Sequence, residues 1–212
     1  MKNRQQIKDM KALLKDMEPY VKDAKFLHSG RRFGNFNLLP REVWGNWLFC
    51  VVLQKLHGAA ITFAEDDKGD GIIIDKKTGQ TVPTEHVSAL DIPAGNSLPM
   101  GDARIIGAIE QKIARGPEYA EGKFLLVFFD GAGVWYRKNV REAINGRHNF
   151  KAIYCIGLES PGPVGYAYTL TQFHPQTPDA SISFKVRING GFSDWSVFRL
   201  QDEEDKVIEI EI

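Results

Sequence analysis

Two short segments of the chain are continuously apolar, and they constrain the fold more than any other feature. They are residues 124–129, FLLVFF, and residues 152–158, AIYCIGL. A strand that is apolar on both faces is typical of an inner strand in a sheet covered by helices on both sides. Segments with helical periodicity, at 102–113 and 137–146, come before each of them. This order predicts an α/β protein with a mixed sheet flanked by helices.

A further helix is predicted over residues 40–57. Pro40 suits the first turn of a helix, and Gly58 suits the position just after its end. The apolar positions between them, which include Trp44 and Trp47, form a broad face. We therefore expect a core helix here. Residues 5–27 also show helical spacing, interrupted near Pro19, while Asp102 is expected to cap the helix over 102–113.

The remaining segments have the character of β-strands. Residues 59–64, 71–74 and 80–89 predict an antiparallel meander with a turn at Thr78-Gly79. From Gly165 onward apolar and polar residues alternate, which predicts β-rich edge strands around a loop at 175–178. The whole chain, 1–212, is expected to form one domain. Its parts are an N-terminal helical extension (1–39), an α/β core (40–160) and a β-rich C-terminal extension (161–212).

Composition narrows the class of protein. Hydrophobic residues make up 43% of the 212 residues, enough for one core without disulfides. The apolar runs are shorter than the ~20 residues of a membrane-spanning helix, and the N-terminus lacks the apolar stretch of a secretory signal. We expect a cytoplasmic protein with Cys50 and Cys155 as buried free thiols. The formal net charge is zero, with a basic segment at 1–32 and an acidic one at 201–212.

Two carboxylates stand out within the predicted meander. With a two-residue period, Asp70 begins one strand and Glu85 lies on the next, so a hairpin can bring them together. Two such groups against an apolar sheet are costly unless a positive charge neutralises them, and Mg²⁺ held by oxygen ligands is a common solution. Asp70 and Glu85 are therefore candidate metal ligands.

This arrangement resembles the PD-(D/E)XK nuclease superfamily, also described as restriction-endonuclease-like. The resemblance covers roughly residues 40 to 130. It implies a core of a helix, an antiparallel hairpin, a second helix and a further strand. It also implies a metal-binding Asp, matched by Asp70, and an acid-X-Lys motif, matched by Glu85 but with Val87 in place of the Lys. Some members supply the Lys from the following helix, where Lys112 is available.

Lys112 falls on the same side of its predicted helix as Ile105, Ala108 and Ile109, which is the side that faces the sheet. Two interpretations stay open at this point. Its ammonium group can pair with Asp70 and Glu85, or its stem can lie along the core while its charge reaches water. The first interpretation makes Lys112 a candidate catalytic residue together with the two acids.

Other polar residues near the motif have a structural and a functional interpretation. Glu42 can contact a metal site or simply favour the first turn of its helix. His86 alternates away from Glu85 and is expected to be structural, and Asp75 is expected in the turn. Asp66 and Asp67 are expected in a solvated loop, close enough to Asp70 to share a metal site.

Three hypotheses about function follow. The resemblance implies a nuclease that uses Mg²⁺ or Mn²⁺ on Asp70 and Glu85, with Lys112 near the attacking water, to hydrolyse phosphodiester bonds in DNA rather than RNA. Val87 and the zero net charge favour an alternative: a catalytically inactive domain of this fold that binds nucleic acid or a protein partner. The third is an unrelated α/β protein in which the spacing is accidental. A homodimer is compatible with each of them.

Overall fold

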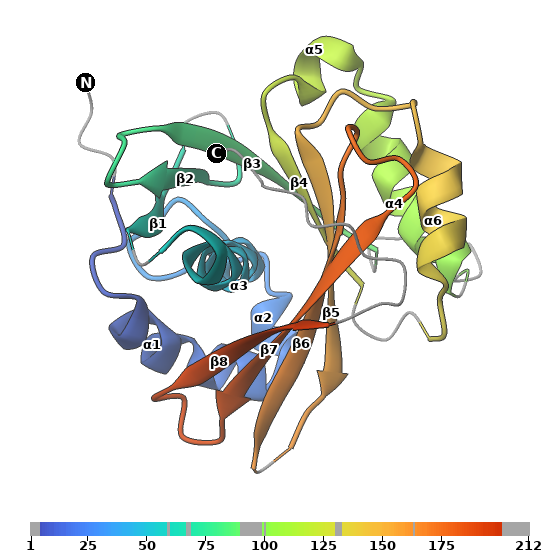
Figure 1. Ribbon diagram of the computed structural model, residues 1–212. Coiled ribbons are helices and arrows are strands. Elements are labelled where there is room, and N and C mark those ends of the chain that lie inside the picture. Colours follow the sequence, from blue (N-terminus) through green and yellow to red (C-terminus); the bar gives the residue numbers. More distant parts are fainter. Residues whose placement is uncertain are drawn as a thin grey trace.

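The computed structural model describes residues 5–58, 60–66, 69–89, 99, 101–129, 133–162 and 164–200. The acidic segment 201–212 and Asp67 lie outside the described residues. The described part is an α/β structure built on one mixed sheet. The sheet curls around helix α3, while α4 and α6 lie against its other face (Figure 1).

The helices are α1 (Met10–Lys22), α2 (Ala24–Leu27), α3 (Pro40–His57), α4 (Asp102–Ile113), α5 (Pro117–Ala120) and α6 (Arg137–Ile144). The strands are β1 (Ile61–Ala64), β2 (Ile72–Asp75), β3 (Thr81–Ser88), β4 (Phe124–Phe128), β5 (Ala152–Ser160), β6 (Gly165–Phe173), β7 (Ser181–Asn189) and β8 (Trp195–Leu200). Their order in the sheet is the order of the sequence.

The sheet is antiparallel at both ends and parallel in the middle. Strand β4 is parallel to both β3 and β5, and every other neighbouring pair is antiparallel. Helices α4 and α6 occupy the two crossovers that parallel neighbours require. The continuously apolar segments predicted as inner strands are β4 and the first part of β5, and each is buried on both faces.

Two hydrophobic cores lie on opposite faces of the sheet. The larger contains the buried residues of α1 and α3 and one face of β4 to β7, including Leu126, Tyr154 and Val186. The smaller lies beneath α4 and α6 and contains the other face of β3 to β5, including Val87 and Leu125. Alternate residues of the same strand therefore enter different cores, as the two-residue period of a strand requires.

Helix α3 confirms the prediction of a core helix. It begins at Pro40 and ends at His57, with Gly58 following at a φ of 98°, a conformation that glycine adopts without strain. Trp44 and Trp47 are fully buried and stack with their ring centroids 5.0 Å apart. The indole N–H of Trp47 donates to the carbonyl of Met10, which joins α1 to α3.

The structure confirms two further predictions and corrects a third. The antiparallel pairing of residues 72–74 with 81–83 is confirmed, and Cys50 and Cys155 are buried free thiols. The expectation of edge strands after Gly165 was wrong in part, because β6 and β7 are inner strands and β8 follows them in the sheet. Each of these strands continues the sheet through a hairpin, so alternation alone did not identify the edge.

The predicted cap of α4 was also wrong. The residue before the helix is Gly101, and Asp102 is its first residue. The carboxylate of Asp102 instead accepts hydrogen bonds from the backbone N–H of Tyr136 and the side-chain amide of Asn139. It therefore ties α4 to the start of α6. No helix within the described ranges is long and apolar enough to cross a membrane.

Candidate functional site

Hydrogen bonds to β3 continue beyond the first residue of β2 and bring Asp70 near Glu85. Ile72 pairs with Pro83, the N–H of Thr84 donates to the carbonyl of Gly71, and the N–H of Asp70 donates to the carbonyl of Thr84. Asp70 and Gly71 therefore both bond to Thr84, the residue before Glu85, as in a β-bulge. The two acids meet because the backbone of Asp70 bonds to the residue that precedes Glu85 on β3.

A polar contact from α3 holds this end of the hairpin. The side-chain amide of Asn46 donates to the carbonyl of Asp70 at 2.9 Å and accepts from the hydroxyl of Thr84 at 2.8 Å. Gly71 lies between them with a φ of 143°, and a Cβ there would stand 2.3 Å from the Asn46 amide nitrogen. Only glycine therefore allows α3 to approach the strand this closely.

The Asp70 carboxylate is partly buried. Its Oδ2 accepts a hydrogen bond of 2.7 Å from the backbone N–H of His86. Burial raises the pKa of Asp70, the hydrogen bond from His86 opposes this shift, and the charge of Glu85 adds to it. The positive charge of Lys112 acts in the opposite direction. Asp70 thus interacts electrostatically with both of the other predicted site residues.

Glu85 is the most enclosed member of the site, with only 5% of its side chain exposed. Its Oε2 accepts from the hydroxyl of Tyr119 and from the ammonium of Lys112 at 3.2 Å. Its Oε1 accepts from Lys123 at 3.1 Å. Burial raises the pKa of Glu85, but the hydrogen bonds from Tyr119 and Lys123 and the charges of both lysines lower it below its ordinary value. Glu85 is therefore a carboxylate at neutral pH.

The Lys112 ammonium lies between the helix α4 and the sheet. It contacts Glu85 and also the Tyr119 hydroxyl at 3.1 Å, and 14% of the side chain is exposed. Burial lowers the pKa of Lys112, but Tyr119 and Glu85 raise it above its ordinary value. Of the two orientations left open by the sequence, the structure has Lys112 paired with the carboxylate.

Glu42 adds a third carboxyl group from the first turn of α3. Its Oε2 accepts from the backbone N–H of Leu39 at 2.8 Å. Burial raises the pKa of Glu42 to about 7, and the nearby charge of Asp70 contributes in the same direction. Arg41 and Lys112 act against the shift. At neutral pH this group is therefore divided between its neutral and charged forms.

Oxygen atoms also gather beside Gly69, one residue before Asp70. A Cβ built on Gly69 would lie 3.2 Å from the carbonyl oxygen of Thr84, 3.3 Å from Oδ2 of Asp66 and 3.8 Å from Oε1 of Glu85. Three oxygens, the donor type that Mg²⁺ prefers, thus lie close to Gly69. Asp66, expected in a solvated loop, is brought to the site by the end of β1.

Two other polar residues do not hydrogen-bond to the site through their side chains. The side chain of His86 lies against α3, where a Cβ on Gly45 would approach its Cε1 to 2.6 Å. This agrees with its expected structural role. Asp75 accepts from the N–H of Lys77 and the hydroxyl of Thr78, so it forms the turn.

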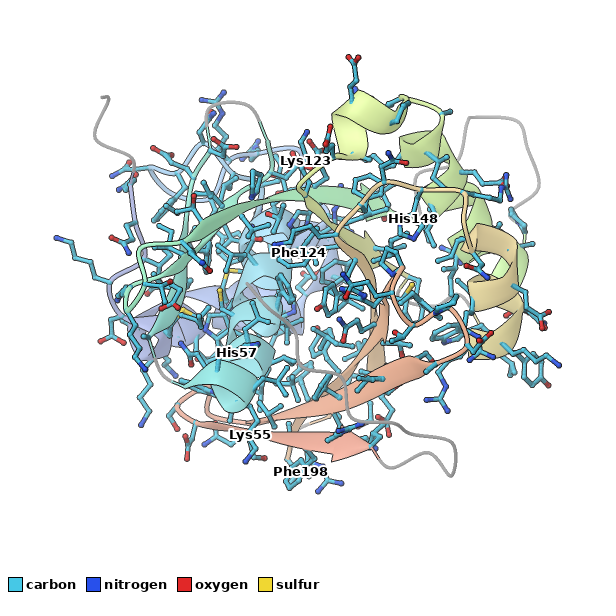
Figure 2. The ribbon with its side chains drawn as sticks, turned by 45° about the horizontal axis from the view of Figure 1, so that its top comes forward. Lys55, His57, Lys123, Phe124, His148 and Phe198 are labelled. Atoms are coloured by element: carbon cyan, nitrogen blue, oxygen red, sulfur yellow. The ribbon has the colours of Figure 1, made fainter. Side chains whose placement is uncertain are left out.

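Tyr119 and Lys123 were not predicted as site residues. The Tyr119 ring lies at the centre of a cationic group, with Lys123 4.3 Å and Arg115 4.5 Å from its centroid. Figure 2 labels Lys123 next to Phe124, at the beginning of β4. A two-residue period puts Lys123 on the same face as Leu125, but only the sheet order shows that this face adjoins Glu85.

Within the described residues, no group of three or more His, Cys, Asp and Glu side chains has the geometry of a metal site. Comparisons of the chain with models of protein families, with curated proteins and with solved structures found no match.

Proposed function

We propose that this protein is a metal-dependent nuclease that hydrolyses phosphodiester bonds, with DNA as the preferred substrate. One observation carries the proposal: Asp70 just before β2, Glu85 on β3 and Lys112 on α4 meet in one site. The element order α3, β1, β2, β3, α4, α5, β4 also contains the helix, antiparallel hairpin, second helix and further strand implied by the resemblance to PD-(D/E)XK nucleases. The resemblance alone favours DNA over RNA.

The oxygen atoms of the residues at the site are ligands of the type that magnesium and manganese ions prefer. Asp70 and Glu85 would hold the ion, and the oxygens around Gly69 provide further hard donors. When bound, such an ion lowers the pKa of water and stabilises negative charge on a phosphate. The partly buried setting strengthens these electrostatic effects, because fewer water molecules screen them.

The side chains and backbone groups of the site supply the remaining interactions. Asp70 is oriented by the N–H of His86, and Glu85 is oriented by Tyr119, so both carboxylates keep a fixed geometry. Lys112 stays protonated and can donate a hydrogen bond to the attacking water or to a phosphate oxygen. It takes the place of the motif Lys at position 87, where this chain has Val87.

The first test is Asp70→Asn. We expect it to lower metal-dependent cleavage by roughly a hundredfold or more while the fold persists, because the amide keeps the shape but removes the charge that balances the ion. The purified chain is incubated with mixed DNA and RNA and with Mg²⁺, Mn²⁺ or a chelator. Asp75→Asn, in the exposed turn of the same hairpin, is the matched control. Equal cleavage by Asp70→Asn, or in chelator, would rule out this chemistry.

A catalytically inactive domain that binds nucleic acid or a protein partner is the second candidate. It is favoured by the occupancy of Glu85, whose two oxygens already contact the ammonium groups of Lys112 and Lys123. A carboxylate neutralised in this way supports the fold without a metal. Absence of cleavage of every substrate, together with binding to nucleic acid that is insensitive to chelator, would favour this candidate.

A further inference from the structure

Lys123 holds the one oxygen of Glu85 that Tyr119 and Lys112 leave available. Strand β4 runs parallel to β3 with Leu125 opposite Glu85, so Lys123 projects from the same face two residues earlier. Its ammonium lies 3.1 Å from Oε1 of Glu85 and over the ring of Tyr119, and 23% of the side chain is exposed. Lys123 is thus both paired at the site and partly open to water.

A divalent cation at this site would meet the ammonium of Lys123 on the same oxygen. Oε1 of Glu85 also lies 3.8 Å from the position of a Cβ on Gly69, close to the oxygens of Thr84 and Asp66 that adjoin this glycine. Two cations in contact with a single buried oxygen repel each other strongly where few water molecules screen them. Cation binding therefore requires that Lys123 move away from Oε1.

The charges around the site also determine which ligand can bind after a divalent cation. The positive groups around the site are Lys112, Lys123 and Arg41, and they face the carboxyl groups of Asp70, Glu85, Asp66 and Glu42. A divalent cation leaves this set with excess positive charge. A phosphate anion at the same place restores the balance, and the flexible stem of a lysine lets its ammonium turn to a phosphate oxygen.

We propose that Lys123 is an exchangeable occupant of the site, which leaves Glu85 when a divalent cation binds and transfers its ammonium to a substrate phosphate. This inference rests on the proposed function. It makes cation and phosphodiester bind cooperatively: each raises the affinity of the protein for the other by the same factor. Without nucleic acid the site favours its own lysine over a metal ion.

The test measures Mn²⁺ binding by calorimetry for the native chain, Lys123→Met and Lys151→Met. The last is a matched control, because Lys151 stands beside Lys123 at the start of the next strand, with its ammonium 5.7 Å from the centroid of Phe124. Each protein is titrated alone and with an oligonucleotide of cleavage-resistant phosphorothioate linkages. Circular dichroism confirms that the variants fold.

Without the oligonucleotide we expect Lys123→Met to bind Mn²⁺ roughly tenfold more tightly than the native chain and Lys151→Met. With it, the affinity of the native chain should rise by a similar factor and that of Lys123→Met by much less. Equal affinities of the native chain and Lys123→Met, no effect of the oligonucleotide, or no Mn²⁺ binding would each overturn the inference. Cooperative binding without cleavage would support the lysine exchange and contradict the proposed nuclease activity. Cleavage by the native chain, with equal Mn²⁺ affinities of the native chain and Lys123→Met, would support the nuclease activity and contradict the lysine exchange.

Discussion

Three carboxyl groups of one site have surroundings that shift their pKa values differently. Glu85 is held as a carboxylate by hydrogen bonds and two lysines, although burial opposes its charge. Asp70 and Glu42 have raised pKa values because burial outweighs their hydrogen bonds to backbone N–H groups. Glu85 differs from the other two because it accepts hydrogen bonds from the side chains of Tyr119 and Lys123, and these bonds lower its pKa.

The raised pKa of Glu42 predicts a dependence of stability on pH. The carboxyl group passes from an ordinary value of 4.5 to about 7 on folding. Its contribution to stability is therefore fully present below the lower value and is lost as the pH rises through the upper one. Glu42→Gln stays neutral and can still accept from Leu39. We expect it to be more stable than the native chain by about 1 to 2 kcal/mol at pH 8 and little different at pH 4.5.

Urea denaturation at the two pH values measures the difference in stability between Glu42→Gln and the native chain. Other groups such as His86 titrate in both proteins, so their effect on stability cancels in this difference. Glu121→Gln, at an exposed position, serves as the control. A stability difference that does not change with pH would contradict the assignment of a raised pKa to Glu42.

Among the elements, α3 connects the core to the site. Its Trp44 and Trp47 fill the larger core, while its Asn46 holds the backbone of Asp70. Successive residues of a helix project about 100° apart, so one turn can serve both purposes. The rigidity of this helix therefore determines where the hairpin end that bears Asp70 lies.

Trp47→Ala is expected to lower the free energy of unfolding by about 3 to 5 kcal/mol, because it opens a cavity in the core. The change also removes the stacking on Trp44 and the hydrogen bond to Met10. Leu56→Ala, on the same helix but with a side chain 41% exposed, should change stability by less than about 1 kcal/mol. Chemical denaturation measures both, and similar midpoints for the two variants would disprove the prediction.

At the scale of the whole molecule, the C-terminal strands belong to the same core as the first helices. Buried residues of β6 and β7 share one hydrophobic cluster with those of α1 and α3. The described parts of the expected N-terminal and C-terminal extensions therefore pack against the α/β core. A shared core of this kind favours a single cooperative unfolding transition.

Val186→Ala, in the middle of β7 and fully buried, tests this cooperativity. We expect a loss of about 1.5 to 3 kcal/mol. The loss should appear equally in tryptophan fluorescence, which reports partly on α3, and in circular dichroism, which reports on the whole chain. Val164→Ala, with its side chain 90% exposed, is the control. Two transitions at different denaturant concentrations would show that the C-terminal strands unfold independently.

The sequence by itself determined the local features of this protein. The apolar runs of β4 and β5, the limits of α3 at Pro40 and Gly58, and the hairpin of β2 and β3 follow from periodicity and turn residues. It also predicted that Lys112 faces the sheet, because this depends only on helical spacing. Each of these features depends on residues that are near one another in the chain.

Only the tertiary structure decided which distant elements are neighbours. The parallel pairing of β3 with β4 brings Lys123 to Glu85, and α5 brings Tyr119 to the same carboxylate. Likewise, the sequence showed alternation after Gly165 but not the inner positions of β6 and β7. The physical reason is that periodicity fixes the face on which a side chain lies, whereas the partner of that face depends on how the whole chain buries its apolar surface.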